Sequence, residues 1–566
     1  MDEKLMEQYN IWKTNAKGDP DVEKELMDME GDEIAIEDAF YRNLEFGTGG
    51  LRGVIGAGTN RINIHTIARA SQGLANYVNR HFSGDDKKIA VSFDSRIKSD
   101  VFSKVAAGVF AANGIKVHIY SELMPVPCLS YATRYLKCAA GVMVTASHNP
   151  SKYNGYKVYG ADGCQITSDA AKEILNEIEK LDMFSDVKMA DFTEQLNAGN
   201  IEYISDDVYT AFVNEVKAQS VLGDAKVDKN IAIVYSPLNG SGLKPVLRTL
   251  QESGYTNITV VKEQEKPDGN FPTCPYPNPE IREAMELGIK CAKENQADLL
   301  IATDPDCDRV GIAVSDPTAG EGEYRLLSGN EVGVLLLDYI CSRRIANGTM
   351  PEDPVLAKTI VSTDLADRVA QRYGVRTTNV LTGFKYIGEQ IAQLEEKGKE
   401  NSYIFGFEES YGYLSGTYVR DKDAVDGTFM ICEMFAYYAS IGKTFIERLD
   451  ELYVKFGYCL NTLYSYQFEG AAGFKKMQEI MANFRKGIDS LGGKKIETCL
   501  DYSQGIDGLP KSDVLKYLLE DNCSVVVRPS GTEPKLKTYI SVSAPDKETA
   551  AAQEAKLDQA LKTMMK

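Results

Sequence analysis

The 566-residue sequence lacks several patterns that would place it in common classes of protein. No apolar run approaches the roughly 18 residues that a membrane-spanning helix needs. The first residues, Met1-Asp2-Glu3-Lys4, have no signal-peptide character. None of the 11 cysteines forms a Cys-x-x-Cys pair, which argues against a zinc site and a disulfide framework. We therefore expect a cytoplasmic protein with reduced thiols and no membrane partner.

Positive charge is scarce as well, since 63 Lys and Arg residues face 82 Asp and Glu residues, a net charge of −19. This balance argues against nucleic acid or an anionic membrane as a partner. An anionic substrate would need basic residues gathered at one place. The composition, 43% hydrophobic and 26% charged, is that of an ordinary soluble globular protein. The length exceeds what one hydrophobic core supports and predicts about three to four domains.

A strand, a helix, a glycine stop and a second strand occur in this order three times. The strand pairs are 88–94 with 115–120, 230–235 with 258–261, and 354–361 with 376–380. This order indicates βαβ units and predicts three related α/β domains with mixed, mostly parallel sheets. The tail mixes a Tyr-rich segment, an amphipathic helix and short strands, which indicates a smaller α+β domain. We expect domains at 1–205 (with acidic helices over 1–45), 206–322, 323–447 and 448–566.

The most informative segment is Thr145-Ala146-Ser147-His148-Asn149-Pro150, which follows an apolar run expected to be a buried strand. The chain must turn sharply there, because the residue before a proline is pushed out of the helical region. Ser147 is therefore presented at the carboxyl end of a strand, where open α/β sheets build their sites. An ordinary polar turn is the alternative.

A second apolar strand leads into Asp304-Pro305-Asp306-Cys307-Asp308-Arg309. Three carboxylates at alternate positions form an oxygen-rich cluster suited to Mg²⁺. An EF-hand would need Gly and Glu where this chain has Arg309 and Ser315. We therefore expect a magnesium loop rather than a calcium loop or a solvated acidic turn.

A third strand precedes the segment from Arg528 to Pro534. An arginine fork, the hydroxyls of Ser530 and Thr532 and the exposed backbone of Gly531 suit a phosphate group. A plain turn gives no reason for the basic residues that flank this segment.

Two further loops are informative only in context. The glycine-rich segment 46–53 is neither a Walker A loop nor a dinucleotide-binding loop, because no Gly-Lys-Ser/Thr follows and Arg52 stands where glycine would be needed. Glu408 and Ser410 follow another strand, and a carboxylate and a hydroxyl at this spacing suit adjacent sugar hydroxyls. An uninvolved acidic turn is the alternative.

A serine nucleophile, a metal loop and a separate phosphate site together describe phosphoryl transfer through a phosphoserine. With these motifs in this order, the chain resembles the α-D-phosphohexomutase superfamily of phosphoglucomutases and phosphomannomutases from about residue 40 onward. It is most similar to the longer bacterial phosphoglucomutases of the phosphoglucomutase-2 type. The resemblance implies three α/β domains and a smaller fourth around a central cleft.

The resemblance also implies roles for individual residues. Ser147 would carry the phosphoryl group and contribute to the metal site with Asp304, Asp306 and Asp308. Catalytic positions would be Ser147, His148 as candidate general base, Arg52, Arg309 and Lys422. Substrate-binding positions would be Arg96, Lys157, Lys358, Thr382, Gly383, Glu408, Ser410, Arg528, Ser530, Gly531 and Thr532.

We therefore expect an intramolecular phosphotransferase of the isomerase class that interconverts α-D-glucose 1-phosphate and glucose 6-phosphate. Mg²⁺ and the intermediate glucose 1,6-bisphosphate would be needed. Phe407, Tyr411 and Tyr413 crowd the sugar loop, so mannose, glucosamine and pentose phosphates stay open as substrates. A phosphoserine phosphatase and a non-catalytic sugar-phosphate sensor are the rivals, but neither explains all the motifs. The sequence leaves monomer and homodimer open.

Overall fold

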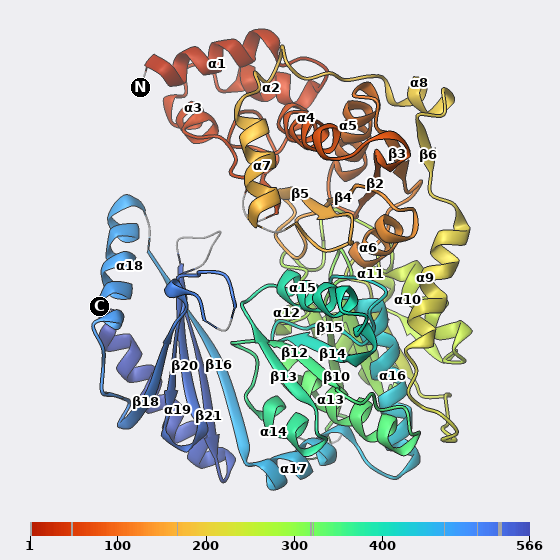
Figure 1. Cartoon of the computed structure of the whole chain (residues 1–566), viewed down its shortest axis with the longest axis vertical. Helices are drawn as coiled ribbons and strands as arrows, with labels where there is room; N and C mark the ends of the chain where they lie inside the picture. Colours follow the sequence, from red (N-terminus) through yellow and green to blue (C-terminus); the bar gives the residue numbers. More distant parts are fainter. Residues whose placement is uncertain are drawn as a thin grey trace.

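The computed structural model describes residues 3–565 except 47, 48, 167, 317, 319, 321, 469, 507 and 530–534. Within them, four sheets follow one another along the chain, and we call the units built on them domains 1 to 4. Figure 1 shows domain 1 at the top, domains 2 and 3 below it, and the blue domain 4 at the lower left. Three α/β domains and a smaller α+β domain are thus confirmed.

The chain begins with three helices that share a small core of their own. They are α1 (Glu3–Asn15), α2 (Pro20–Asp28) and α3 (Glu33–Phe40). The core contains Trp12 and Phe40, whose rings meet edge to face at 5.7 Å. The carboxylate of Asp19, which caps α2, forms an ion pair of 2.8 Å with Lys98 of domain 1. These helices therefore lie against domain 1.

Domain 1 contains a six-stranded sheet in the order β1-β5-β4-β2-β3-β6. Its elements are β1 (Gly50–Val54), α4 (Ile64–His81), β2 (Lys88–Phe93), α5 (Ser99–Ala112), β3 (Lys116–Ile119), α6 (Val126–Tyr135), β4 (Ala140–Val144), β5 (Tyr153–Gly160), α7 (Ser168–Glu179), α8 (Phe192–Asn197) and β6 (Ile201–Tyr203). Strands β4, β2, β3 and β6 are parallel, whereas β5 runs antiparallel between β4 and β1. Every residue of β4 is buried, because helices cover both faces of the sheet.

Domains 2 and 3 repeat this plan. Domain 2 has the strand order β11-β10-β9-β7-β8, and domain 3 has β13-β12-β14-β15. The elements of domain 2 are α9 (Asp206–Ala218), β7 (Ile233–Ser236), α10 (Leu243–Glu252), β8 (Ile258–Val260), α11 (Lys262–Glu265), α12 (Arg282–Asn295), β9 (Leu299–Thr303), β10 (Val310–Ser315) and β11 (Tyr324–Leu327). Those of domain 3 are α13 (Gly329–Ala346), β12 (Val355–Thr359), α14 (Leu365–Arg372), β13 (Arg376–Val380), α15 (Phe384–Glu396), β14 (Tyr403–Glu408), β15 (Gly412–Leu414), α16 (Ala424–Ser440) and α17 (Phe445–Phe456).

Two of the expected domain boundaries need to move. A boundary at residue 322 falls before β11, which is hydrogen-bonded to β10 and completes the sheet of domain 2. A boundary at residue 447 falls inside α17, whose Leu449 and Leu452 belong to the same core as domain 3. We therefore place these boundaries after Leu327 and at Gly457.

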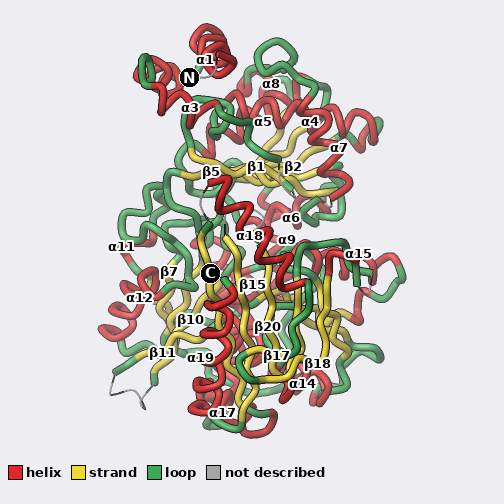
Figure 2. The backbone as a smooth tube through the Cα atoms, turned by 90° about the vertical axis from the view of Figure 1, so that its left-hand side faces the viewer, coloured by secondary structure: helices red, strands yellow, loops and turns green. Residues whose placement is uncertain are grey.

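Domain 4 is an antiparallel sheet in the order β16-β21-β20-β19-β18-β17, with two helices. Its elements are β16 (Tyr458–Gln467), α18 (Gly470–Arg485), β17 (Ser490–Leu491), β18 (Lys494–Asp501), β19 (Leu515–Leu519), β20 (Cys523–Pro529), β21 (Lys535–Ala544) and α19 (Lys547–Met564). Figure 2 shows α18 and α19 in front of this sheet and the sheet of domain 1 above the other strands.

The hydrophobic cores join the domains unequally. One continuous cluster includes Tyr131 of domain 1, Phe212 of domain 2 and Phe405 of domain 3. Domain 4 has a core of its own. It meets domain 3 through a small cluster that includes Leu381 and Val526. The first cluster therefore joins domains 1 to 3, although domain 1 also has a separate core, whereas domain 4 is attached through a smaller apolar contact.

One loop design occurs in each of domains 1, 2 and 3. A parallel strand ends, the chain turns, and the next strand returns antiparallel to it: β4 to β5, β9 to β10, and β14 to β15. Each turn contains one non-glycine residue in the left-handed region, namely Ser147 (φ 52°), Cys307 (φ 50°) and Tyr411 (φ 67°). Such a residue costs about 1 kcal/mol. All three turns carry residues expected at the site.

Candidate functional site

The turn after β4 presents Ser147 as the sequence predicts. The backbone at Ser147 is left-handed (φ 52°), within the turn between β4 and β5, and its N–H donates to Oγ1 of Thr145 at 2.8 Å. The side chain is nearly buried, with 4% of the residue exposed. Its hydroxyl donates to Oδ2 of Asp304 at 3.0 Å and lies 3.2 Å from Nδ1 of His148. The serine of domain 1 thus directly contacts the acidic loop of domain 2.

The three aspartates of that loop form one buried cluster. One carboxylate oxygen from each of Asp304, Asp306 and Asp308 lies within 4.8 Å of the others. The backbone amides of Asp308 and Arg309 donate to Oδ1 of Asp304 at 3.0 and 2.9 Å, which fixes that carboxylate. Oδ1 of Asp306 and Oδ1 of Asp308 are buried and accept no hydrogen bond from any residue that the structure describes. Buried carboxylate oxygens without donors, all facing one point, fit a hard divalent cation.

Two lysines offset the charge of this cluster. Nζ of Lys157, on β5, lies 2.8 Å from Asp306 and 3.5 Å from Asp308. Nζ of Lys422, from domain 3, lies 3.0 Å from Asp308. Burial and the neighbouring Asp308 raise the pKa of Asp304. Although burial opposes it, Lys157 holds the pKa of Asp306 below its ordinary value.

Arg309 and His148 border the same cluster. The guanidinium of Arg309 forms an ion pair of 2.6 Å with Glu280. Burial, and next the positive charges of Arg309 and Arg52, lower the pKa of His148 well below its ordinary value. The imidazole is therefore neutral at neutral pH and can accept a proton from Ser147. Arg52 is exposed on β1, and its Nη1 donates to Asn149 at 3.4 Å.

The charges of Lys422 and Arg309 also act on the sugar loop of domain 3. Burial raises the pKa of Glu408, while the charges of Lys422 and Arg309 lower it. Oε1 of Glu408 accepts a hydrogen bond of 3.0 Å from the N–H of Gly383, so these two predicted positions are in contact. Thr382 and Ser410 are half-buried beside them in sequence.

Two predicted substrate-binding residues are engaged elsewhere. The Lys358 side chain is fully buried, and its Nζ lies 3.0 Å from Asp367 and 3.9 Å from Asp364. Arg96 is 3% exposed and donates to backbone carbonyls of the Ser147 turn itself. Their spacing in the sequence could not reveal this, because it does not indicate which way a side chain points.

The phosphate segment of domain 4 is only partly described. Arg528 is half-buried near the end of β20. Burial and Glu409 of the sugar loop raise the pKa of Tyr539 on β21, while Arg528 lowers it. Arg528 thus lies on the side of domain 4 that faces domain 3. Ser530, Gly531 and Thr532 lie outside the described residues.

Sequence reasoning missed some members of the cluster. Glu280, which pairs with Arg309, lies in a loop that carries no recognisable motif. Thr145 is inside the serine motif, but nothing in the sequence shows that its hydroxyl donates to Asp94 at 2.6 Å and lies 3.2 Å from Asp306.

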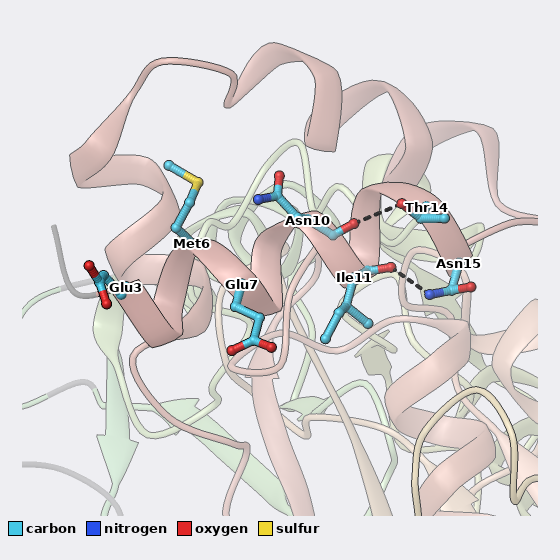
Figure 3. A pocket seen from close by; sticks show the side chains of 7 residues that line it. All are labelled: Glu3, Met6, Glu7, Asn10, Ile11, Thr14 and Asn15. Atoms are coloured by element: carbon cyan, nitrogen blue, oxygen red, sulfur yellow. Dashed lines mark hydrogen bonds between the residues drawn. The ribbon is translucent and has the colours of Figure 1, made fainter.

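A hollow elsewhere on the surface does not compete as a candidate site. It measures about 640 Å³ and is lined by one face of α1, including Glu3 and Glu7 (Figure 3). Its polar side chains Thr14 and Asn15 bond to carbonyls of the same helix. Among the residues that the structure describes, no basic one lines it, so it does not suit a phosphate. Within the part of the chain that the structure describes, every helix is too short or too polar to traverse a lipid bilayer.

Comparison with known families covers most of the chain. Residues 43–184, 208–320 and 328–456 match, in order, phosphoglucomutase/phosphomannomutase alpha/beta/alpha domains I, II and III. Residues 469–560 match the phosphoglucomutase/phosphomannomutase C-terminal domain.

Individual relatives agree with these matches. Phosphoglucomutase of Staphylococcus saprophyticus is 36% identical over 513 residues, which is 88% of this chain and 90% of that protein. The enzyme of Staphylococcus haemolyticus is 35% identical over 519 residues, 90% of this chain and 92% of that protein. In fold, the chain resembles a putative phosphomannomutase from Thermus thermophilus, with a TM-score of 0.68, 22% identity, and coverage of 92% of this chain and 99% of that one. It also resembles the Paramecium phosphoglucomutase pp63/parafusin, with a TM-score of 0.69, 18% identity, and coverage of 92% and 95%.

Proposed function

Because the chain belongs to the phosphoglucomutase/phosphomannomutase family, we propose that it interconverts α-D-glucose 1-phosphate and glucose 6-phosphate through a phosphoserine at Ser147. The relatives named phosphoglucomutase support glucose as the sugar. The observation that carries the proposal is the contact between Oγ of Ser147 and the buried aspartate cluster. A nucleophile beside a cation site suits transfer of a dianionic phosphoryl group.

The reaction takes two transfers. Phosphoserine 147 first gives its phosphoryl group to the free hydroxyl of the sugar phosphate, which forms glucose 1,6-bisphosphate and leaves the Ser147 hydroxyl. After the bisphosphate reorients in the site, Oγ of Ser147 attacks its other phosphate, a new Oγ–P bond forms, the sugar O–P bond breaks, and the sugar oxygen takes up a proton to become a hydroxyl. Nδ1 of His148, 3.2 Å from Oγ, is placed to take the serine proton in this second step.

The remaining side chains neutralise and orient charge. Asp304, Asp306 and Asp308, with an oxygen at Ser147, would hold Mg²⁺, which when bound draws negative charge from the phosphoryl oxygens. Lys157 and Lys422 are held against the aspartates. Burial opposes a charged ammonium at Lys422, but Asp308 and Asp421 raise its pKa, so it stays protonated and acts as a charge. Arg309 and the exposed Arg52 add positive charge on the substrate side.

Sugar and distal phosphate would be held by domains 3 and 4. The buried carboxylate of Glu408, fixed by the amide of Gly383, suits two adjacent sugar hydroxyls, with Ser410 and Thr382 nearby. The phosphate that does not react would bind at Arg528 with Ser530, Gly531 and Thr532, as the family resemblance implies. We also infer a cytoplasmic location, which the free thiols of all 11 cysteines support.

The test combines mass spectrometry with kinetics. The purified protein, incubated with glucose 1,6-bisphosphate, should carry a phosphate at Ser147. Ser147→Ala should lose both the phosphate and the mutase activity, whereas Ser151→Ala in the same loop should keep both. Initial rates on glucose 1-phosphate, mannose 1-phosphate and ribose 1-phosphate identify the sugar. A phosphate on another residue, or turnover by Ser147→Ala at saturating bisphosphate, would show that the nucleophile is misassigned.

A further inference from the structure

The guanidinium of Arg96 has no N–H group left for a substrate. Nε donates to the carbonyl of Ser147 at 3.2 Å, and Nη2 donates to the carbonyls of Ser147, at 2.5 Å, and Asn149. Nη1 donates to the carbonyls of Pro150 and Tyr153 at 3.0 and 2.9 Å. An arginine has five N–H donors, and all five are directed at the backbone of the turn that carries Ser147.

Asp94 and Thr145 also hold the same turn. Oδ1 of Asp94 accepts from the N–H of Arg96 at 3.0 Å, and Oδ2 accepts from the hydroxyl of Thr145 at 2.6 Å. That hydroxyl in turn accepts from the N–H of Ser147 at 2.8 Å. The left-handed residue Ser147 is thus fixed at its N–H through Thr145 and at its C=O by Arg96.

Domain 2 covers this arrangement. The ring of Phe271 lies over the guanidinium of Arg96, with the carbon at its centre 5.1 Å from the ring centroid. A Cβ atom at Gly269 would lie 2.4 Å from the backbone nitrogen of Ile97, so only glycine allows the two backbones to approach this closely. The segment 94–97 therefore lies between the Ser147 turn and a turn of domain 2.

We propose that Arg96 is a positioning residue, which fixes the strained Ser147 turn through its five backbone hydrogen bonds and does not bind the phosphosugar. This inference rests on the proposed function of Ser147 and deepens it. It replaces the substrate-binding role that the family resemblance implies for Arg96. The physical reason is that a left-handed serine persists only where surrounding contacts over-determine it.

The proposal predicts that losing Arg96 changes kcat but not KM. A residue that orients the nucleophile changes the rate of phosphoryl transfer, because misplacing the attacking atom by about 1 Å can cost roughly 100-fold. It does not change how well the sugar phosphate is held elsewhere. A residue that holds a substrate phosphate would instead raise KM, with the turn itself intact.

Arg96→Lys is the informative variant, because lysine keeps the charge but has three donors at one point and cannot reach all four carbonyls. The control is Arg376→Lys, a surface arginine of domain 3 that lies 3.6 Å from Asp353. Both are measured against the wild type by steady-state kinetics with glucose 1-phosphate, by transfer of phosphate from glucose 1,6-bisphosphate to Ser147, and by amide hydrogen exchange of the peptide 145–153.

Arg96→Lys should lower kcat and the rate of Ser147 phosphorylation about 100-fold, keep KM within about threefold, and speed exchange in 145–153 at least about tenfold. Arg376→Lys should match the wild type. A KM at least about tenfold higher with unchanged exchange would overturn the proposal. So would an Arg96→Lys variant whose kcat, KM and exchange rate all equal those of the wild type. If the wild type accepted no phosphate, the proposed function would fail, but exchange in 145–153 would still decide what Arg96 does.

A second variant keeps the test open if Arg96→Lys does not fold. Phe271→Leu removes the ring over the guanidinium and leaves every donor of Arg96 in place. It should show a smaller loss of kcat, faster exchange in 145–153 and an unchanged KM. If Phe271→Leu had the same kcat and the same exchange in 145–153 as the wild type, domain 2 would not help to hold Arg96 against the Ser147 turn.

Discussion

The hydroxyl of Ser147 donates a hydrogen bond of 3.0 Å to Asp304, although the two residues lie 157 positions apart and in different domains. Domain 1 supplies the nucleophile, and domain 2 supplies the cluster that receives its hydrogen bond. The ion pair between Asp308 and Lys422 then joins domain 3 to the same cluster. The site therefore exists only where three domains meet, which makes its metal loop a direct subject for mutation.

We predict that replacing Asp304, Asp306 or Asp308 by Asn lowers activity about 100-fold at limiting Mg²⁺ and that excess Mg²⁺ restores part of it. Each change removes one negative charge from the cluster. Asp353→Asn, at the surface of domain 3, is the matched control and should keep the wild-type dependence on Mg²⁺. The measurement is initial rate against Mg²⁺ concentration after treatment with a chelator. Three variants with the wild-type dependence would place the metal elsewhere.

The link between domains 3 and 4 leads to a second prediction. Asp364 accepts from Lys516 at 3.2 Å and from Ser524 at 2.9 Å, both on strands of domain 4. Asp364→Ala leaves the nearly buried Lys516 without its counter-ion and should destabilise the protein by roughly 3 kcal/mol. Asp353→Ala, which breaks the surface pair with Arg376, should cost less than about 1 kcal/mol. Urea unfolding measures both, and equal costs would contradict the prediction.

A third prediction concerns pH. Burial, and next the neighbouring Asp423, raise the pKa of Asp426 to about 8. In the unfolded chain the pKa of this carboxyl is about 3.9. Between these two pKa values the folded protein therefore binds one proton more than the unfolded chain does. The free energy of unfolding must then decrease as pH rises from about 4 toward 8, and this contribution is largest below about pH 4.

Asp426→Asn tests this, because an amide cannot ionise and can still bond to the N–H and Oγ of Ser415. Its Tm should fall less than that of the wild type between about pH 5 and pH 8. Asp450→Asn, on the exposed face of α17, should follow the wild type. If Tm changed with pH in the same way in the wild type, Asp426→Asn and Asp450→Asn, Asp426 would be ionised at neutral pH in the folded state.

The fourth prediction addresses domain 4. Arg528→Ala should raise KM for glucose 1-phosphate about tenfold or more and increase the requirement for added glucose 1,6-bisphosphate, because a charge-assisted grip on the distal phosphate is lost. Ser147 should still accept phosphate, since its turn and the metal loop are untouched. Arg485→Ala, on α18 of the same domain, is the control. Unchanged KM and bisphosphate requirement in Arg528→Ala would exclude this strand as the distal phosphate site.

Much of this architecture follows from local sequence. The strands β2 and β12 lie where apolar runs predict them, because strands buried on both faces are largely apolar segments. The turn at Ser147 follows from the Asn-Pro pair. The domain boundary near β11 does not follow from local sequence, because the pairing of this short strand with β10 is a tertiary contact.

The directions of the basic side chains were also beyond sequence reasoning. Lys157 and Lys358 both lie on buried strands, yet one meets Asp306 and the other Asp367. Which face a strand residue takes follows from the register, but which carboxylate it meets depends on how the sheets are docked. The ion pair between Arg309 and Glu280 depends on the same docking.

The three turns with left-handed residues at Ser147, Cys307 and Tyr411 have a consequence for how the site can change shape. Each turn is also bonded to another domain. The carbonyls of Asp306 and Cys307 accept from the N–H groups of Val126 and Ala424 at 3.0 and 3.2 Å, and that of Tyr411 accepts from the N–H of Val310 at 3.0 Å. A rotation of one sheet against another would therefore strain these bonds as well as alter the spacing between nucleophile, cation loop and sugar loop. The relative placement of the three turns is thus fixed by backbone bonds between domains, not only by side chains.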